Sequence, residues 1–302
     1  MTKTIQDILN EKPSQASSNA QSIQYIDTKD AYDKWAEIYD TDGNFLQRLD
    51  TIEMRTLLPQ FLNRVNARFH ATNPLKLVDL GCGTGRNTIQ LLEAVSAHEK
   101  NQKSNQKLDD SDLEVAHRSS VEVIGVDASA GMLEVARTAI QSATRELSTT
   151  VSLGTFDILQ PISDKSKLPE SLQDGAVGVI STLVLEHIPL KAFFEAASAI
   201  MKPGAHFLVT NMHAQMGSLS QAGFTDPQTG VKIRPTSYCH SIADVLAAAA
   251  EAGFQVEPLG EECGSDGVLE RMVDEKLSGM LGARATKWIG IQVWFGVCFS
   301  KL

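Results

Sequence analysis

One stretch of the chain decides the fold, and it reads Leu75-Lys76-Leu77-Val78-Asp79-Leu80-Gly81-Cys82-Gly83-Thr84-Gly85. An apolar run of strand length leads into three glycines, and residues 88–97 beyond them have helical periodicity. A glycine loop between a strand and a helix is the usual setting of a nucleotide-binding loop. The stretch therefore predicts a ligand held against backbone at the end of a strand.

The loop matches neither of the two common phosphate-binding patterns. No lysine follows Gly85, as a P-loop requires, and Arg86 stands where the dinucleotide fingerprint has its third glycine. What remains is GxGxG preceded by Asp79. A carboxylate at this point repels phosphate and favours a cationic or ammonium-bearing ligand.

A second acid follows on the next predicted strand, Val123-Ile124-Gly125-Val126-Asp127. A carboxylate at such a strand end can accept both hydroxyls of a ribose. The separation between Gly85 and Asp127 is longer than the usual gap of about 20 residues. Residues 98–119 are polar and charged, and we interpret them as a surface insertion that accounts for the excess.

Strands and helices alternate along the rest of the chain, which predicts an α/β protein with a doubly wound sheet and its ligand at the carboxyl edge. Residues 11–22 are rich in Ser, Gln and Asn, and residues 1–27 are expected to be a flexible or loosely docked arm. Residues 28–72 predict a helical cap and 73–302 the sheet domain. Within that domain, the irregular segment 214–240 is interpreted as a substrate cover.

Composition excludes several classes of protein. The 302 residues carry a net charge of −10 without a basic patch, which disfavours nucleic acid as a partner. The four cysteines lack metal-ligand spacing, so no metal site is expected, and they fit a reducing compartment. No run of apolar residues reaches the length of a membrane span. A cytoplasmic monomer or homodimer is expected.

Further motifs sharpen the prediction. Residues 125–133 read GVDASAGML, 155–158 read TFDI, 181–188 read STLVLEHI and 202–205 read KPGA. Together with DLGCGTG they resemble the class I S-adenosylmethionine-dependent methyltransferases, in particular the group acting on small molecules. The resemblance implies a seven-stranded Rossmann-like sheet of order 3-2-1-4-5-7-6 with the last strand antiparallel. It also implies S-adenosylmethionine as cofactor and S-adenosylhomocysteine as product.

The resemblance and the loop chemistry together assign the cofactor site. Asp79 would serve the ammonium, Asp127 the ribose and Asp157 the adenine amino group. Met132 would either cover an adenine face or pack the start of a helix. The expected cofactor-binding residues are Trp35, Tyr39, Asp79, Gly81, Cys82, Gly83, Gly85, Asn87, Asp127, Ala128, Met132, Phe156, Asp157, Ile158, Thr182 and Leu183.

Methyl transfer is an in-line displacement, which a general base assists when the acceptor is a hydroxyl or a protonated amine. His187 and His213 follow the fourth and fifth predicted strands and are the candidate bases, although each could simply pack the rim. His240 is more simply a helix cap. The residues expected to bind substrate are Tyr32, Glu186, Met216, Phe224, Arg234 and Tyr238.

These observations predict an N- or O-methyltransferase of a small, partly apolar metabolite bound in a covered pocket. The chain lacks an Asp/Asn-Pro-Pro-Tyr/Phe motif after the fourth strand, which further disfavours a nucleic-acid base as acceptor. Two alternatives stay open. One is an enzyme of this fold that catalyses cyclisation or isomerisation. The other is a non-catalytic subunit of a heteromeric methyltransferase, against which the intact glycine loop argues. Arg86 disfavours an NAD(P) oxidoreductase.

Overall fold

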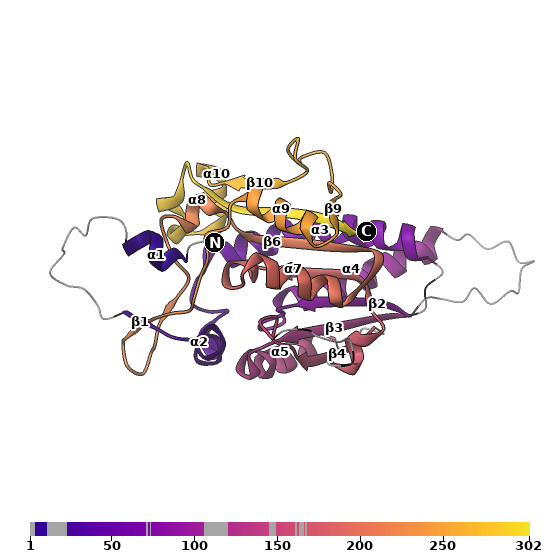
Figure 1. Ribbon diagram of the computed structural model, residues 1–302, viewed down its shortest axis with the longest axis horizontal. Helices are drawn as coiled ribbons and strands as arrows, with labels where there is room; N and C mark the ends of the chain where they lie inside the picture. Colours follow the sequence, from indigo (N-terminus) through magenta and orange to yellow (C-terminus); the bar gives the residue numbers. More distant parts are fainter. Residues whose placement is uncertain are drawn as a thin grey trace, which may run out of the picture.

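The computed structural model describes residues 4–10, 23–70, 72, 74–105, 120–144, 149–160, 162, 166 and 168–302. Its main feature is one large sheet with helices on both faces (Figure 1). The strand order is β10-β11-β6-β5-β2-β3-β4, and β9 pairs with β11. The strands are β2 (Leu75–Leu80), β3 (Val121–Asp127), β4 (Thr150–Thr155), β5 (Ala176–Thr182), β6 (Met201–Met212), β9 (Phe254–Val256), β10 (Leu269–Met272) and β11 (Gln292–Lys301).

The sheet has a parallel centre and an antiparallel edge. Strands β4, β3, β2, β5 and β6 are parallel neighbours, and β11 runs antiparallel to β6. The predicted α/β fold class is confirmed, but within the described residues the sheet has eight strands where seven were expected. The difference arises because β11 is long. Its residues 299–301 pair with β9, while residues 292–296 pair with β10.

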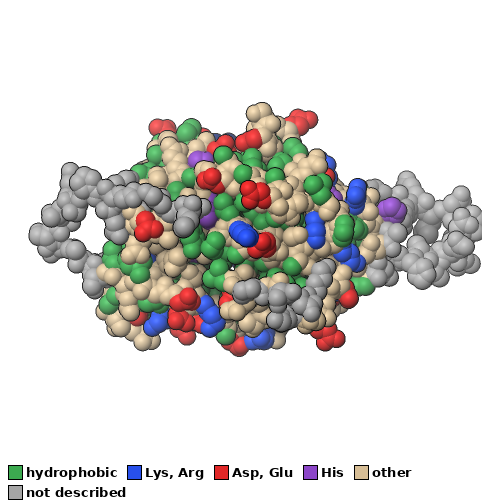
Figure 2. All heavy atoms as spheres, in the orientation of Figure 1, with side chains coloured by type: hydrophobic (Ala, Val, Ile, Leu, Met, Phe, Trp, Pro, Cys, Tyr) green, Lys and Arg blue, Asp and Glu red, His purple; other side chains and the backbone are tan. Residues whose placement is uncertain are grey.

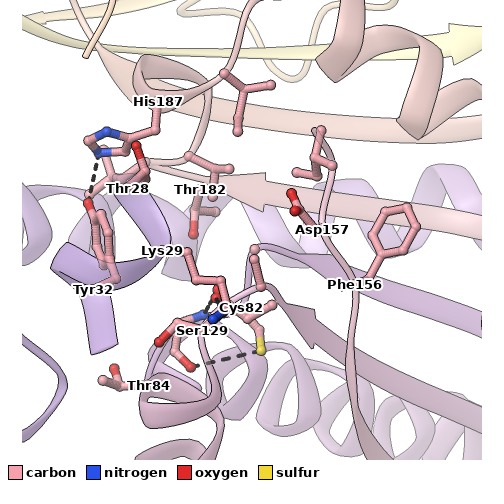
Figure 3. A pocket seen from close by; sticks show the side chains of 18 of the residues that line it. Thr28, Lys29, Tyr32, Cys82, Thr84, Ser129, Phe156, Asp157, Thr182 and His187 are labelled. Atoms are coloured by element: carbon pink, nitrogen blue, oxygen red, sulfur yellow. Dashed lines mark hydrogen bonds between the residues drawn. The ribbon is translucent and has the colours of Figure 1, made fainter. Parts of the chain in front are cut away.

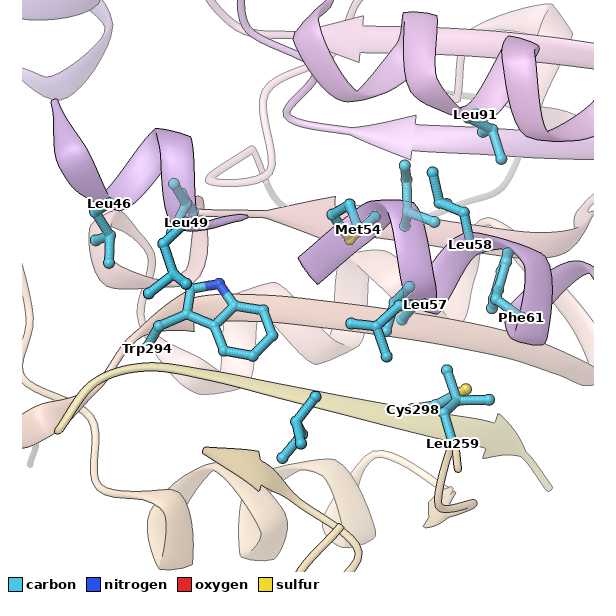
Figure 4. Packing of buried hydrophobic residues seen from close by; sticks show 14 of the residues in the cluster. Leu46, Leu49, Met54, Leu57, Leu58, Phe61, Leu91, Leu259, Trp294 and Cys298 are labelled. Atoms are coloured by element: carbon cyan, nitrogen blue, oxygen red, sulfur yellow. The ribbon is translucent and has the colours of Figure 1, made fainter. Parts of the chain in front are cut away.

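Two hydrophobic clusters cover the faces of the sheet. Leu77 faces helices α3 (Phe45–Phe69), α4 (Arg86–Asn105) and α5 (Ala130–Ala143). Val78, the next residue, faces α6 (Glu170–Gln173), α7 (Leu190–Ala199) and α9 (Ile242–Glu251). Figure 4 shows how leucines and Phe61 of α3 pack onto Trp294 and Cys298 of β11. Because both faces are covered, a ligand can reach the parallel strands only at their ends.

The polar insertion is partly helical. Helix α4 continues to Asn105, so residues 98–105 of the predicted insertion belong to it. Residues 106–119 lie outside the described part of the chain.

The amino-terminal residues and the segment 214–240 share a second, small sheet. Its order is β1-β8-β7, formed by β1 (Ile23–Tyr25), β8 (Lys232–Arg234) and β7 (Phe224–Thr225). Helix α1 (Ile5–Asn10) precedes β1 in the chain, and Ile5 has no exposed surface. Residues 1–3 and 11–22 of the expected arm lie outside the described residues. The described parts of the arm therefore contact the expected substrate cover rather than lying apart from it.

Short helices complete the structure. Helix α2 (Thr28–Trp35) and the 3-10 turn η1 (Ala36–Ile38) follow β1, while η3 (Leu185–His187) follows β5. Helix α8 (Ala214–Gly217) follows β6, and α10 (Glu275–Leu281) and η4 (Ala283–Trp288) precede β11. None of the helices in the described ranges combines the length and apolarity needed to cross a membrane. On the face drawn in Figure 2, acidic and basic side chains are interspersed.

Candidate active site

A partly open cavity lies where β2, β3, β4 and β5 end. The glycine loop forms one wall, and residues from the start of α2 form another (Figure 3). Fourteen of the predicted site residues line it: Tyr32, Tyr39, Gly81, Cys82, Gly83, Asn87, Asp127, Ala128, Phe156, Asp157, Ile158, Thr182, Leu183 and His187. The cavity thus lies at the carboxyl edge of the parallel strands, where the alternation of strands and helices predicts a ligand.

The glycine loop presents its backbone to the cavity. Gly81 and Gly83 have φ values of 77° and 54°, in the left-handed region that favours glycine. A Cβ atom on Gly81 would lie 2.4 Å from Cγ2 of Val184, so no side chain fits there. A Cβ atom on Gly83 would meet nothing within 4 Å, because this residue opens onto the cavity. A ligand can therefore lie directly against the peptide of Gly83.

Asp127 at the end of β3 is held by two backbone donors. The N–H of Gly83 donates to Oδ2 over 2.9 Å, and the N–H of Ser129 donates to Oδ1 over 2.8 Å. Burial raises the pKa of Asp127, while these two hydrogen bonds oppose the shift. Each oxygen keeps acceptor capacity toward the cavity, which suits the paired hydroxyls of a ribose. The donor set therefore fits the nucleoside that the sequence predicts.

The segment after β4 forms the far wall. Phe156, Asp157 and Ile158 line the cavity, and Figure 3 shows the first two on the side away from His187. The N–H of Leu159 donates to Oδ1 of Asp157 over 2.9 Å, which fixes the carboxylate. An apolar ring with one carboxylate at its edge fits an adenine and its amino group.

Opposite this wall, His187 and Tyr32 meet at the cavity. The hydroxyl of Tyr32 lies 2.7 Å from Nε2 of His187, and the two rings make an edge contact (Figure 3). The carbonyl of Thr236 lies 2.9 Å from Nδ1 of the same ring. Burial raises the pKa of Tyr32 well above its ordinary value. The imidazole is thus fixed through both nitrogens while it faces the cavity.

Glu186 lies directly behind this pair. Its Oε1 is 3.3 Å from Nε2 of His187, and its side chain is buried. Oε2 has no hydrogen-bond partner among the described residues. Glu186 itself does not line the cavity, so it faces the imidazole rather than a bound ligand.

Helix α2 and η1 are joined to the cofactor loops by side chains. Oδ1 of Asp33 accepts hydrogen bonds from Oγ of Ser129 over 2.6 Å and from the N–H of Gly131 over 2.9 Å. Oγ1 of Thr84 donates to Asp40 over 2.9 Å. The cap is therefore bound to the loops that follow β2 and β3, and it closes one side of the cavity.

A buried polar cluster lies behind the residues that line the cavity. Asp50 of α3 has no exposed surface, and its carboxylate accepts hydrogen bonds from Arg86, Asn87, Thr210 and Trp294. Asn87 also donates to Oγ1 of Thr182 over 2.7 Å. Because Arg86, Asn87 and Thr182 all line the cavity, this cluster fixes part of its wall.

Several predicted cofactor residues lie elsewhere. The buried carboxyl of Asp79 accepts a hydrogen bond from Thr88 over 2.6 Å behind the loop, and its other oxygen has no partner within the described residues. Gly85 packs toward α5, and Met132 is buried at the start of that helix. Trp35 stacks on Phe224, with ring centroids 5.1 Å apart. None of these residues lines the cavity.

The second candidate base and most predicted substrate residues also lie outside the cavity wall. Nε2 of His213 is 3.1 Å from Glu270 of β10, and Nδ1 caps α8. Met216 is buried in the core. Arg234 donates to the hydroxyl of Tyr25, and Tyr238 stacks on His240. Of the six predicted substrate residues, the structure brings Tyr32 alone to the wall.

Nine lining residues were not anticipated: Asp27, Thr28, Lys29, Thr84, Arg86, Ser129, Leu159, Val184 and Ile188. Asp27 has a sequence signal, since it caps α2 by accepting from the N–H of Lys29. Lys29 in turn lies 3.6 Å from Asp33. Four others lie within the quoted motifs, namely Thr84, Ser129, Val184 and Ile188, and Arg86 and Leu159 each directly follow one. Thr28 has no separate signal. Within the described ranges, no group of three or more acidic, His or Cys side chains could hold a metal.

Comparison with known proteins agrees with this geometry. A family model described as a methyltransferase domain matches residues 72–242. A protein of Emericella nidulans named as an uncharacterized methyltransferase is 47% identical over 293 residues, with 93% of each chain covered.

The chain is also similar to solved structures. The 4+2 cyclase SpnF matches with a TM-score of 0.51 at 14% identity, over 93% of this chain and 99% of its own. Magnesium protoporphyrin IX methyltransferase from Synechocystis PCC 6803, with bound S-adenosylhomocysteine, gives 0.46 at 17% identity, over 90% and 94%. From the family model and the Emericella relative, the chain belongs to the class I S-adenosylmethionine-dependent methyltransferases, and S-adenosylmethionine is its cofactor.

Proposed function

We propose that the enzyme transfers the methyl group to a nitrogen or oxygen of a small, partly apolar molecule, with His187 as general base. One observation carries the proposal. The imidazole of His187 faces the cavity with Nε2 2.7 Å from the hydroxyl of Tyr32 and Nδ1 2.9 Å from the carbonyl of Thr236. A histidine oriented through Nδ1, with Nε2 at the reaction space beside a hydroxyl that can turn aside, has the arrangement of a base.

The partners of the ring determine where its proton lies. The carbonyl of Thr236 can only accept, so Nδ1 carries the hydrogen and donates. In the neutral ring, the lone pair of Nε2 then accepts from the hydroxyl of Tyr32, whose raised pKa keeps it protonated. Nε2 takes a proton from the acceptor when this hydroxyl turns aside. After Nε2 takes up a proton, Oε1 of Glu186 at 3.3 Å stabilises the imidazolium.

The residues at the other end hold the cofactor. The peptides of Gly81 and Gly83 would support the methionine part, Asp127 the ribose, and Phe156 with Asp157 the adenine. S-adenosylmethionine, when bound, supplies a methyl group activated by its sulfonium. Positioning the acceptor atom behind that methyl in a dry space then accounts for most of the rate.

The shape and lining of the cavity support a small acceptor. Helix α2 closes one side, and Leu183, Val184 and Ile188 contribute apolar surface near His187. Of the two cations at the wall, Arg86 is paired with Asp50 and Lys29 lies near Asp33. A protein with a net charge of −10 and no unpaired basic side chain among these wall residues is poorly suited to a polyanion.

Incubation of a metabolite extract with the enzyme and methyl-labelled S-adenosylmethionine tests the proposal. Mass spectrometry should find the label on a small molecule. His187→Gln should lower the initial rate of label transfer by about 10²-fold or more, while S-adenosylhomocysteine affinity changes less than about twofold. His213→Gln is the matched control, because this histidine lies outside the cavity wall, and it should retain the wild-type rate.

Two results would contradict the proposal. If His187→Gln transfers label at the wild-type rate, His187 is not the base. If an extract component is consumed while all label stays on the cofactor, the reaction is a rearrangement or cyclisation instead of methyl transfer.

A further inference from the structure

We infer that Thr4 and Ile5 position the imidazole of His187 through residues 236–238, which lie between them. The inference rests on the proposed function for its catalytic consequence, since His187 is the proposed base. The contacts that carry it come from an amino-terminal segment that is distant in sequence from both His187 and residues 236–238.

One edge of residues 236–238 contacts the amino-terminal segment. The N–H of Ile5 donates to the carbonyl of Ser237 over 2.8 Å. Thr4 forms an antiparallel bridge with Tyr238. These two contacts fix the peptide that follows Thr236.

The other edge contacts the active site. The carbonyl of Thr236 lies 2.9 Å from Nδ1 of His187, and Oγ of Ser237 lies 3.5 Å from the same atom. The N–H of Tyr238 donates to the carbonyl of Glu186 over 2.6 Å. Consecutive carbonyls of one short segment thus bind Ile5 on one side and His187 on the other. A displacement of Ser237 therefore also displaces the acceptor that orients the imidazole.

The amino-terminal side of this arrangement is anchored. Ile5 has no exposed surface and belongs to the same hydrophobic cluster as α3. Oγ1 of Thr4 donates to Asp7 over 2.6 Å and accepts from the N–H of Asp7 over 3.2 Å, a reciprocal cap of α1. Ser237 is also buried, at 1% exposure. Burial of Ile5 and the cap of α1 therefore anchor the amino-terminal side of residues 236–238.

The test uses full-length variants of Ile5 and a readout that does not need the substrate. Ile5→Asp places a charge in an apolar site and should release the segment, whereas Ile5→Leu conserves the anchor. Ile5→Ala is the milder alternative should the aspartate variant fail to fold. Leu281→Ala removes buried surface from the same cluster without touching residues 236–238 and is the stability control.

Nitrogen-15 NMR of the histidine rings reports the result. The His187 signal is identified by its loss in His187→Gln. Wild type and Ile5→Leu should show the Nδ1–H tautomer with a slowly exchanging ring proton. Ile5→Asp or Ile5→Ala should speed that exchange by about tenfold or more, with Leu281→Ala unchanged. The initial rate of label transfer to the extract should fall by a similar factor in the same two variants.

The outcomes separate the two proposals. If the ring of His187 exchanges at the wild-type rate in both disruptive variants, or faster in Leu281→Ala as well, the positioning role is overturned. If the ring proton of His187 exchanges faster in the disruptive variants but neither Ile5→Asp nor His187→Gln slows label transfer, Thr4 and Ile5 do position the imidazole. The proposed role of His187 as base then fails.

Discussion

Arg86 donates to Asp50 over 2.9 Å, and this carboxylate has no exposed surface. Arg86 occupies the position where a dinucleotide-binding loop would have its third glycine, at the first residue of α4. The ion pair joins the start of α4 to α3. In a dinucleotide-binding loop the third glycine lets the helix start pack closely on a strand. Here the charged side chain of Arg86 holds the start of α4 and also lines the cavity.

Asp50→Ala should destabilise the fold by about 3–5 kcal/mol, because it leaves Arg86 without its buried partner. Urea denaturation measures the loss. Asp274→Ala, which removes the exposed cap of α10, is the comparison and should cost about 1 kcal/mol. The double variant Asp50→Ala/Arg86→Met should recover part of the loss, since no charge is then left unpaired. Equal losses in the single and double variants would show that the ion pair is not the cause.

Asp127→Ala should weaken S-adenosylmethionine binding by about 1–3 kcal/mol, or about 5- to 150-fold in Kd. The carboxylate both offers acceptors to the ribose and holds the N–H of Gly83 in place. Titration calorimetry gives the affinity. Glu195→Gln removes a surface charge of α7 and should bind like wild type. Wild-type affinity in Asp127→Ala would place the ribose elsewhere.

Asp79 should make stability depend on pH. Burial raises its pKa to about 7, against 3.8 for a free carboxyl, and the hydrogen bond from Thr88 only partly offsets this. Between about pH 4 and 7 the folded state binds more protons than the unfolded state, so stability falls as pH rises through that window. Above it, the cost of the buried charge is fully present.

Asp79→Asn removes this titration. Denaturant titration from pH 4 to 8 measures the free energy of unfolding of both proteins. This free energy should decline less in the variant than in wild type, and the two declines should differ by up to about 4 kcal/mol at pH 8. Thr88 retains an acceptor in the variant, so packing is conserved. Parallel curves for variant and wild type would mean that Asp79 does not titrate in this range.

Most residues that the local motifs predict for the cofactor line the cavity. The glycine loop and Asp127 are short-range features, because each combines a strand end with the turn that follows it. Parallel strands then place their carboxyl ends at one edge. His213 shows the limit of that rule. It follows β6, which lies beyond β5 from the glycine loop, and its imidazole pairs with Glu270 instead of facing the cavity.

Contacts between segments distant in the chain could not be predicted, because they leave no local pattern in the sequence. Asp50 binds partners 36, 160 and 244 positions away, so nothing in its own neighbourhood distinguishes it from an exposed acid of an amphipathic helix. The same holds for Thr236, which meets His187 across 49 positions. Low apparent hydrophobicity also concealed the docking of Ile5, whose side chain is buried although polar residues surround it in the sequence.

Asp33 should control how long the cofactor stays bound. Burial acts to raise its pKa, but the hydrogen bonds from Ser129 and Gly131 outweigh burial and lower it. Because the folded-state pKa lies below the unfolded value of 3.8, this contact is fully present above that value. It weakens as pH falls through the lower, folded-state pKa. At neutral pH the contact holds α2 against the loop that follows Asp127.

Asp33→Ala should therefore release S-adenosylhomocysteine about three- to tenfold faster, since the cap then opens without breaking these hydrogen bonds. Stopped-flow displacement measures the rate. Asp30→Ala, an exposed acid on the same helix and outside the cavity wall, provides the control for charge and should release at the wild-type rate. If both variants release S-adenosylhomocysteine at the same rate, opening of the cap does not limit product release. The product must then leave the cavity without passing α2.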